Sequence, residues 1–336
     1  MAGNMLWRVL AFPRFRLITL PTPLERASRL GEKLGIDLWI KRDDVMELAL
    51  GGNKARKLEF IIGHVLSQGY DTVVTTGALH SNHVRLTMAA ARKAGLGAYA
   101  VLYKHLPYVE PALQGNILLN SVFGGNVFYA ESQSGVQELT ERLVNDLKAR
   151  GKRPYVIPAG GANEYGMLGY VLAPFEILEQ AYMHGIKPHY IVHASGTTAT
   201  QAGLVLGLRL AGAEDVRVLG ISVGRSAKTM HERILELTAS TARLLGVDIK
   251  VRDDDVVVYE DYTFGGYGVI TKEVVETIKT VGLLEGLILD PVYTAKAMYG
   301  LIDLAEKGEI RGTVMFLHTG GIPVLFQYAG EFARYA

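Results

Sequence analysis

The sequence contains no cysteine. Disulfide bonds, zinc sites with thiolate ligands and catalysis by a cysteine nucleophile are therefore excluded. The chain also lacks an apolar run of the roughly 20 residues that a membrane-spanning helix needs. Near the N-terminus, Arg8 interrupts a short apolar stretch and no small-residue cleavage site follows it, so no signal peptide is expected. We predict a cytoplasmic protein that does not act in a membrane.

Excess charge of one sign is missing too. The formal net charge is only +1, and Lys and Arg form no long basic stripe, so binding of DNA or RNA is not expected. The Gly-x-Gly-x-x-Gly motif of dinucleotide-binding folds does not occur, and no Gly-Lys-Ser/Thr follows a glycine-rich loop at the Walker spacing. Nucleotide binding by either common motif is therefore not predicted.

Hydrophobic residues make up 49% of the 336 residues, which is enough for a large core and favours two domains. Apolar, β-branched runs alternate along the chain with amphipathic segments. This alternation predicts an α/β fold with two open, twisted, mostly parallel sheets that carry helices on both faces. Ligands in this class bind outside the carboxyl ends of the strands.

The expected strands cover residues 38–40, 72–76, 98–103, 126–130, 155–158, 190–193, 216–223 and 313–317. The expected helices cover residues 53–66, 82–94, 111–123, 137–150, 165–184, 202–210, 227–245, 269–281 and 295–307. Gly77 is expected to end the second strand, and Gly169 and Pro174 to interrupt the helix over 165–184.

The most informative segment is GGNKARKLE at residues 51–59. Two glycines permit a tight turn, and Asn53 then opens an apolar-periodic helix. Lys54 lies in the first helical turn, where the helix dipole disfavours a cation, so its pKa should fall if it is shielded from water. An amine of that kind suits Schiff-base chemistry. A solvated lysine at an ordinary helix start is the alternative that these residues leave open.

A second segment, SGTTAT at residues 195–200, lies between a strand and a helix. Successive backbone N–H groups at a helix N-terminus, with hydroxyl groups beside them, form a site for a phosphate. Simple capping of the helix by Ser or Thr is the alternative. Six small or hydroxyl-bearing residues are more than a cap requires, so we favour the phosphate.

The third segment, GALHSNH at residues 77–83, follows the strand over 72–76. His80 and His83 suggest a metal pair, but no acidic residue or third ligand lies near them. Histidines without further ligands nearby usually cap helices or pack in the core, so no metal site is predicted.

Taken together, GGNKARKLE, the preceding KRDD at 41–44 and the two later segments resemble one group of pyridoxal phosphate (PLP) enzymes. The group comprises the 1-aminocyclopropane-1-carboxylate (ACC) deaminases and D-cysteine desulfhydrases, within the tryptophan synthase β-like (fold type II) enzymes. The likeness runs in the same motif order from about Pro21 to the C-terminus. It implies pyridoxal 5'-phosphate held by Lys54 as a Schiff base, with Lys54 later acting as the base for the α-proton. The phosphate contacts are then expected from Gly196, Thr197, Thr198, Ala199 and Thr200.

The resemblance also assigns roles around the substrate. Ser81 would face the substrate carboxylate and the reacting carbon as a catalytic proton donor or acceptor, and Asn82 would donate to the phenolic oxygen of PLP. His83 is placed with them in the substrate site, although ACC deaminases carry Gln there. Tyr267 and Tyr293 match the two active-site tyrosines of the group, and either phenol could act as an acid or base if its pKa is lowered. Tyr262 is a rival to Tyr267.

Two threonines indicate the substrate. ACC deaminases have Glu at position 294 and Leu at position 319, whereas desulfhydrases have hydroxyl residues at both, as in Thr294 and Thr319 here. A carboxylate keeps the pyridine nitrogen protonated, and a hydroxyl group cannot, so the electron sink is weaker. Elimination of thiolate from D-cysteine is less demanding than opening a cyclopropane. We therefore favour a D-cysteine desulfhydrase, with ACC deaminase as the alternative and a non-catalytic protein that binds a phosphate ligand as a lesser one.

The resemblance further implies the division into domains. Residues 1–56 and 165–336 would form a large domain and residues 57–164 a small inserted one, with PLP in the cleft between them. A homodimer and a small amino-acid substrate are the partners that it implies.

Overall fold

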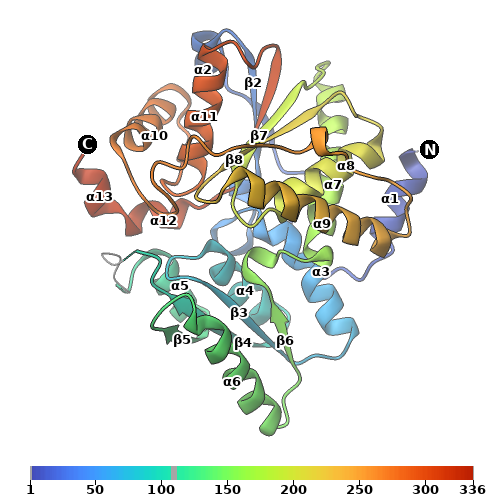
Figure 1. The fold of residues 1–336 in the computed structure, drawn as a ribbon, viewed down its shortest axis with the longest axis vertical. Helices are drawn as coiled ribbons and strands as arrows, with labels where there is room; N and C mark the ends of the chain where they lie inside the picture. Colours follow the sequence, from blue (N-terminus) through green and yellow to red (C-terminus); the bar gives the residue numbers. More distant parts are fainter. Residues whose placement is uncertain (1, 107–111, 336) are drawn as a thin grey trace.

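The computed structural model describes residues 2–106 and 112–335. It contains two separate sheets, a large one of six strands and a small one of four. Figure 1 shows the large sheet with its helices above and the small sheet with its helices below. Every described pair of neighbouring strands is parallel except β1 and β2, which confirms the predicted fold class.

The large sheet has the order β1-β2-β10-β7-β8-β9. Its strands are β1 (Leu24–Arg26), β2 (Asp37–Arg42), β10 (Thr313–His318), β7 (Tyr190–Ser195), β8 (Arg217–Ser222) and β9 (Val257–Tyr259). Alternate residues along its strands enter different cores. Val192 and Phe316 pack in one hydrophobic cluster, and their neighbours Ile191 and Met315 pack in another, as expected of a sheet covered on both faces.

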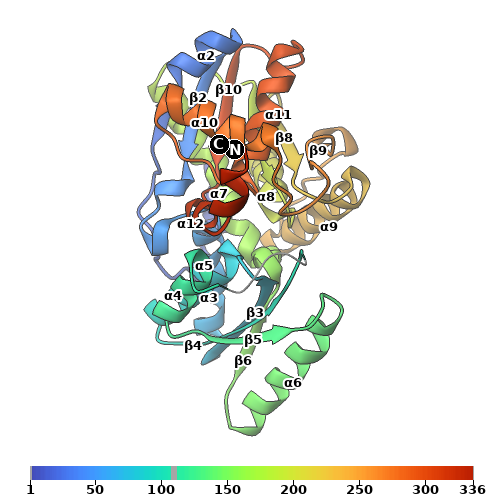
Figure 2. The same cartoon turned by 90° about the vertical axis from the view of Figure 1, so that its left-hand side faces the viewer.

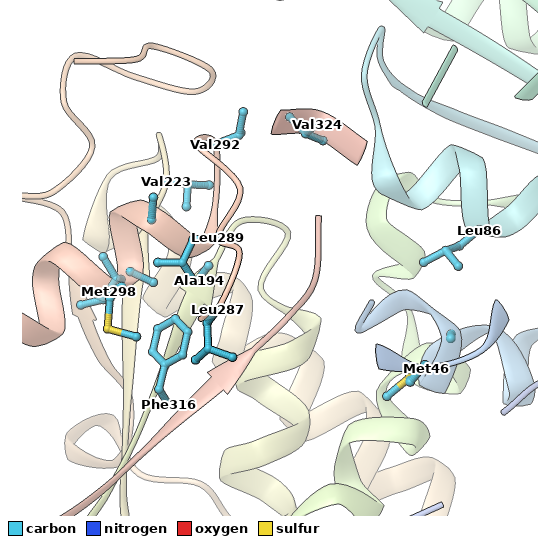
Figure 3. Close-up of a cluster of buried hydrophobic side chains, with 14 of the residues drawn as sticks. Met46, Leu86, Ala194, Val223, Leu287, Leu289, Val292, Met298, Phe316 and Val324 are labelled. Carbon is cyan, nitrogen blue, oxygen red and sulfur yellow. The ribbon is translucent and has the colours of Figure 1, made fainter. Parts of the chain in front are cut away.

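Helices cover both faces of this sheet. One face carries α1 (Ala2–Leu10), α7 (Glu164–Met183), α8 (Ala199–Ala211) and α9 (Ala227–Leu245). The other carries α2 (Ser28–Leu34), α10 (Lys272–Glu285) and α11 (Thr294–Glu306). Figure 3 shows the core of this second face, where Met298 of α11 approaches Phe316 of β10 beside Leu287 and Leu289.

The small sheet has the order β5-β4-β3-β6, with β5 (Asn126–Ala130), β4 (Gly97–Tyr103), β3 (Thr72–Ala78) and β6 (Pro154–Ile157). Helix α6 (Gly135–Ala149) covers one face through Leu143 and Leu147, which pack on Val74 and Val101. Helix α4 (Asn82–Lys93) lies on the opposite face (Figure 2). Helix α3 (Lys54–Ser67) packs against both α4 and α7 and so joins the two halves of the molecule. Helices α5 (Gly115–Val122), α12 (Ile322–Gln327) and α13 (Ala329–Ala333) complete the fold.

Three sequence predictions about interruptions of helices and strands are wrong. Strand β3 continues through Gly77, which pairs with Leu102; a Cβ atom at Gly77 would lie 2.7 Å from Ser81 Oγ, so glycine serves close packing there. Helix α7 is continuous through Gly169 and Pro174. A Cβ at Gly169 would lie 2.3 Å from the carbonyl oxygen of Arg56, so this glycine permits the close approach of α7 to α3.

Other differences concern the ends of predicted helices. The helix expected over 111–123 begins at Gly115, and its predicted first residue lies outside the described part of the chain. Ala199 and Thr200 belong to the first turn of α8, two to three residues before the predicted start at residue 202. The helix expected from residue 269 begins at Lys272. The sequence did not predict α1, α2, α12, α13, β1 or β9, which are short or terminal.

A buried ionic network lies at the start of α3. Arg56, 1% exposed, donates to both carboxylate oxygens of Asp43 at 2.8 Å and to both oxygens of Glu176 at 2.8 and 2.9 Å. Lys41 pairs with Glu176 at 2.5 Å, and the Tyr170 hydroxyl donates to Asp43 at 2.6 Å. The network ties β2, α3 and α7 together within the helical turn that carries Lys54.

Acid is expected to weaken this network. Burial alone would raise the pKa of Glu176, but the hydrogen bond and charge of Arg56 and the charge of Lys41 outweigh burial and lower it from 4.5 to about 2. Because the pKa is lower in the folded state, the stabilisation is complete above about pH 4.5 and is lost as the pH falls towards about 2; its size is about 3 kcal/mol. Urea unfolding at neutral pH and near pH 3 should show a smaller acid loss in Glu176→Gln than in the wild type. An equal loss in both proteins would contradict this assignment.

Among residues 2–106 and 112–335, no helix is long and apolar enough to cross a membrane. The same residues contain no group of three or more His, Cys, Asp or Glu side chains placed to hold a metal ion.

Candidate active site

A cavity of about 440 Å³ opens where the carboxyl ends of the two sheets face each other. The segments that line it include those that follow β2, β3, β4, β6, β7, β8 and β10, as the sequence predicts for this fold class. Most of the predicted site residues line this one cavity, although they come from positions throughout the chain. They are Lys54, Ser81, Asn82, His83, Gly196, Thr197, Thr198, Thr200, Tyr267, Tyr293 and Thr319.

Lys54 begins α3 after an unusual turn. Ala49, Leu50, Gly51 and Gly52 all have positive φ, with values of 47°, 66°, 69° and 119°. A Cβ at Gly51 would lie 2.0 Å from the carbonyl oxygen of Asp44, so only glycine fits. The turn is held by hydrogen bonds from Gly52 N to Asp43 O and from Asn53 N to Thr319 O, both 3.0 Å. It delivers the Lys54 side chain into the cavity.

The surroundings of Lys54 favour the neutral amine. Burial lowers its pKa to about 8; the charge of Asp290 opposes this effect and that of Arg85 adds to it. Lys54 Nζ donates to Asn53 Oδ1 at 3.0 Å, and Asn53 Nδ2 donates to Thr200 Oγ1 at 3.0 Å. Asn53 therefore connects the lysine with the loop over residues 195–200. From the sequence, Asn53 was expected only to start the helix.

The loop over 195–200 leads from β7 into α8. Thr198 has a φ of 68°, a region that costs a residue other than glycine about 1 kcal/mol or more. Ser195 Oγ is buried and has no hydrogen-bond partner among the described residues. Gly196 presents no side chain to the cavity, and a Cβ there would lie 3.5 Å from Val223 and 3.7 Å from Tyr293. Ala199, in contrast, is fully buried and does not line the cavity.

Ser81, Asn82 and His83 follow β3 at the start of α4. Ser81 caps the helix, its Oγ accepting from Val84 N at 3.3 Å. His83 Nε2 contacts Thr75 Oγ1 at 2.8 Å; that hydroxyl donates its proton to Ile157 O, so His83 donates from Nε2. Burial, with the charges of Lys54 and Lys57, lowers the pKa of His83 well below its ordinary value. His83 is therefore a neutral ring whose Nδ1 has no partner among the described residues.

Tyr267 and Tyr293 face the cavity together. Their hydroxyl groups form a hydrogen bond, and their rings meet edge to face with centroids 5.7 Å apart. Burial raises the pKa of both phenols, so the lowered pKa that acid–base catalysis by tyrosinate would need is not found. Tyr262 does not line the cavity; its hydroxyl donates to Asp303 at 2.7 Å. Of these two tyrosines, Tyr267 lines the cavity and Tyr262 does not.

The two threonines behave differently. Thr319 lines the cavity directly after β10. Thr294 is fully buried outside the lining, and its Oγ1 bonds Asp290 Oδ1 at 2.9 Å and Asp290 N at 2.7 Å. Asp290 also accepts from the backbone N–H groups of Val292, Tyr293 and Thr294, each at 2.9 Å. The expected contact of Thr294 with the cofactor is therefore corrected, because this residue starts α11 and its hydroxyl is turned to Asp290 and away from the cavity wall.

The cavity wall carries positive and neutral groups only. Among the described residues that line it, none is Asp or Glu, whereas Lys54 and Arg225 are present. The arrangement suits an anionic ligand that bears a phosphate and a carboxylate. Tyr103, His105, Gln133 and Arg225 also line it, and no motif in the sequence marked them.

Comparisons with known proteins point to the same chemistry. The family profile described as pyridoxal-phosphate dependent enzyme matches residues 16–320. The chain is 44% identical over 322 residues to a Pyrococcus abyssi protein named "Putative 1-aminocyclopropane-1-carboxylate deaminase", covering 95% of each chain. It is 41% identical over 321 residues to a Klebsiella pneumoniae protein named D-cysteine desulfhydrase, covering 94% of this chain and 96% of the relative.

Solved structures show the same kinship. The crystal structure of a protein described as an ACC deaminase homologue superposes with a TM-score of 0.92 at 43% identity and covers all of both chains. The processed form of threonine deaminase isoform 2 from Solanum lycopersicum superposes with a TM-score of 0.65 at 19% identity, over all of this chain and 88% of the other, which is a likeness of fold.

Proposed function

Because the chain belongs to the family of pyridoxal-phosphate dependent enzymes, we propose that it is a lyase that eliminates hydrogen sulfide from D-cysteine. The overall reaction converts D-cysteine and water into pyruvate, hydrogen sulfide and ammonia. The observation that carries the proposal is that Thr319, and no described carboxylate, faces the cavity.

The residues present fit the cofactor. An amine with a pKa near 8, the buried Ser195 hydroxyl without a described partner and the bare backbone at Gly196 meet in one cavity that has no acidic residue in its described lining. Lys54 would hold the aldehyde end of PLP. Gly196, Thr197, Thr198 and Thr200 would hold its phosphate, and Asn82 its phenolic oxygen. When bound, PLP withdraws electrons from the α-carbon of the amino acid and so acidifies the α-proton.

The chain's own groups would supply the remaining chemistry. The Lys54 amine, whose pKa is lowered to about 8 so that a large fraction is neutral near that pH, would accept the α-proton. The Ser81 hydroxyl would donate to the substrate carboxylate, whereas neutral His83, whose Nδ1 has no described partner and can only accept, would take a hydrogen bond from an N–H or O–H group in the substrate site. Because both phenols stay protonated and one of them donates to the other, the pair has one free hydroxyl proton, which would donate a hydrogen bond to the departing thiolate; neither phenol would remove a proton.

The choice between thiolate and a cyclopropane carbon as leaving group rests on the cavity lining near Thr319, where no described residue is a carboxylate. Asp290, the buried carboxylate whose charge acts on Lys54, is saturated by the capping bonds of α11 and lies outside the lining. A hydroxyl group such as that of Thr319 cannot keep the pyridine nitrogen of the cofactor protonated. The cofactor would therefore withdraw electrons only moderately. Thiolate is a good leaving group and tolerates such a sink. Cleavage of a cyclopropane ring in ACC requires a stronger one.

ACC deaminase is the second candidate. It is favoured by the names of several relatives at 41% to 46% identity over 95% of this chain. It would convert ACC and water into 2-oxobutyrate and ammonia.

The deciding experiment offers the PLP-loaded protein D-cysteine, L-cysteine and ACC separately and measures sulfide, pyruvate and 2-oxobutyrate. We expect sulfide and pyruvate in equal amounts from D-cysteine and no 2-oxobutyrate. Lys54→Ala protein, purified in parallel, controls for contaminating activity. Substantial 2-oxobutyrate from ACC would transfer the assignment to ACC deaminase, and turnover of L-cysteine alone would reverse the stereochemical part.

We retain three further expectations from the family resemblance as proposals. The large domain would comprise residues 1–56 and 165–336 and the small one residues 57–164, with PLP between them. The protein would act in the cytoplasm. It would act there as a homodimer, which sedimentation of the loaded protein tests.

A further inference from the structure

Arg85 is a fully buried arginine in the fourth position of α4 with an unusual set of partners. Its guanidinium donates to neutral oxygens: Gly51 O at 2.6 Å, Asn116 Oδ1 at 3.0 Å and Asn82 Oδ1 at 3.3 Å. No carboxylate pairs with it in the described part of the chain, and its Nε has no partner there. A buried cation without a counterion is costly, which indicates a use for its charge at this place.

The hydrogen bonds around Arg85 have only one consistent direction. An arginine donates and never accepts, so the atoms of Asn116 and Asn82 that face it must be their amide oxygens. Asn116 Nδ2 is thereby turned the other way, where it donates to Asn82 Oδ1 at 2.9 Å and to His80 O at 2.8 Å. With two donors on its oxygen, Asn82 must present its NH₂ group to the cavity that it lines.

We propose that Arg85 and Asn116 are positioning residues that fix Asn82 as a hydrogen-bond donor towards an anionic oxygen of the bound cofactor. The inference rests on the role proposed above for Asn82. Arg85 fixes the orientation of the Asn116 side-chain amide. Asn116, fully buried on α5, in turn fixes the orientation of the Asn82 amide. Through its hydrogen bond to Gly51 O, Arg85 also connects these two asparagines with the turn that carries Lys54.

The charge of Arg85 adds to the geometry. Donor groups in a chain polarise one another, so a cation behind the Asn82 oxygen strengthens donation from its NH₂ group. Such a donor stabilises a phenolate oxygen and lowers the pH at which the bound chromophore loses its proton. Arg85 and Asn116, acting through Asn82, therefore influence the electronic state of the cofactor as well as its orientation.

The test compares four variants of the PLP-loaded protein: Asn82→Ala, Asn116→Leu, Asn116→Asp and Asn82→Ala combined with Asn116→Leu. Asn116→Asp keeps the shape and the acceptor for Arg85 but removes the donor to Asn82, and its carboxylate neutralises the charge of Arg85. Two quantities are measured without substrate: the pH midpoint of the visible absorption change and the dissociation constant of PLP. Circular dichroism checks that each variant is folded.

We expect each single variant to raise the pH midpoint by about one to two units, the effect of losing a hydrogen bond to a charged group. The dissociation constant of PLP should rise about tenfold or more. Asn116→Leu should add nothing further in the Asn82→Ala background. Wild-type values in both Asn116 variants, with a shift in Asn82→Ala, would overturn the positioning role and leave the role of Asn82 intact. No shift in Asn82→Ala would overturn both.

Additive effects in the double variant would also overturn the proposal, because Asn116 would then act independently of Asn82. A shift in Asn116→Leu but none in Asn116→Asp would assign Asn116 to holding Arg85 and would likewise contradict it.

Discussion

Replacing Lys54 by alanine is expected to abolish covalent attachment of PLP and to lower kcat for the preferred amino acid by at least about 10³-fold. The physical reason is that Lys54 is the amine that both lines the cavity and has its pKa lowered to about 8. Removing it deletes the attachment point and the base together. Binding of PLP through its phosphate would remain, because the 195–200 loop is unchanged.

The measurement is borohydride reduction of the loaded protein followed by peptide mapping. Lys57→Ala is the matched control, because Lys57 lies three residues further along α3 and is also a buried amine with a lowered pKa. Lys57 Nζ donates to Gly160 O at 3.2 Å and does not line the cavity. We expect label on Lys54 in the wild type and in Lys57→Ala. Label on any other lysine in the wild type would contradict the assignment of Lys54 as the residue that holds PLP.

Replacing Arg56 by methionine is expected to lower the free energy of unfolding by about 3–5 kcal/mol. The side chain of methionine fills much of the same space, but Asp43 and Glu176 lose the four hydrogen bonds that Arg56 donates to them, and Thr22 loses one. Asp43 is fully buried, so its charge would remain in the protein interior without a cation of comparable contact. Urea unfolding at neutral pH measures the loss.

Arg26→Met is the control for loss of an arginine ion pair as such. Arg26 contacts Asp37 at 2.9 Å, but its side chain is 61% exposed, so the expected loss is below about 1 kcal/mol. Equal losses in the two variants would show that burial does not govern the strength of these pairs.

Much of the fold followed from local patterns in the sequence. The strand over residues 126–130 and the helix over 227–245 were predicted with the bounds that the structure has, because alternation and helical periodicity are local properties. The errors at Gly77 and Gly169 have one cause. Glycine weakens regular structure in isolation, but Gly77 pairs with Leu102 of β4 and Gly169 packs closely on Arg56 of α3, so tertiary packing retains the regular backbone at both.

The site divides in the same way. The sequence by itself determined the family resemblance, and with it the expected kind of chemistry, because the lysine turn, the 195–200 loop and the Ser-Asn pair are contiguous motifs that can be matched without the fold; the residues taken alone left a solvated lysine and simple helix capping open. Only the tertiary structure decided which side chains share the cavity. It separated Tyr267 from Tyr262 and Thr319 from Thr294, and it brought Asn116 to Asn82 and Glu176 to Arg56 across 34 and 120 residues. Hydrogen bonds and buried charges of this kind depend on the packing of distant elements, and no local pattern encodes them.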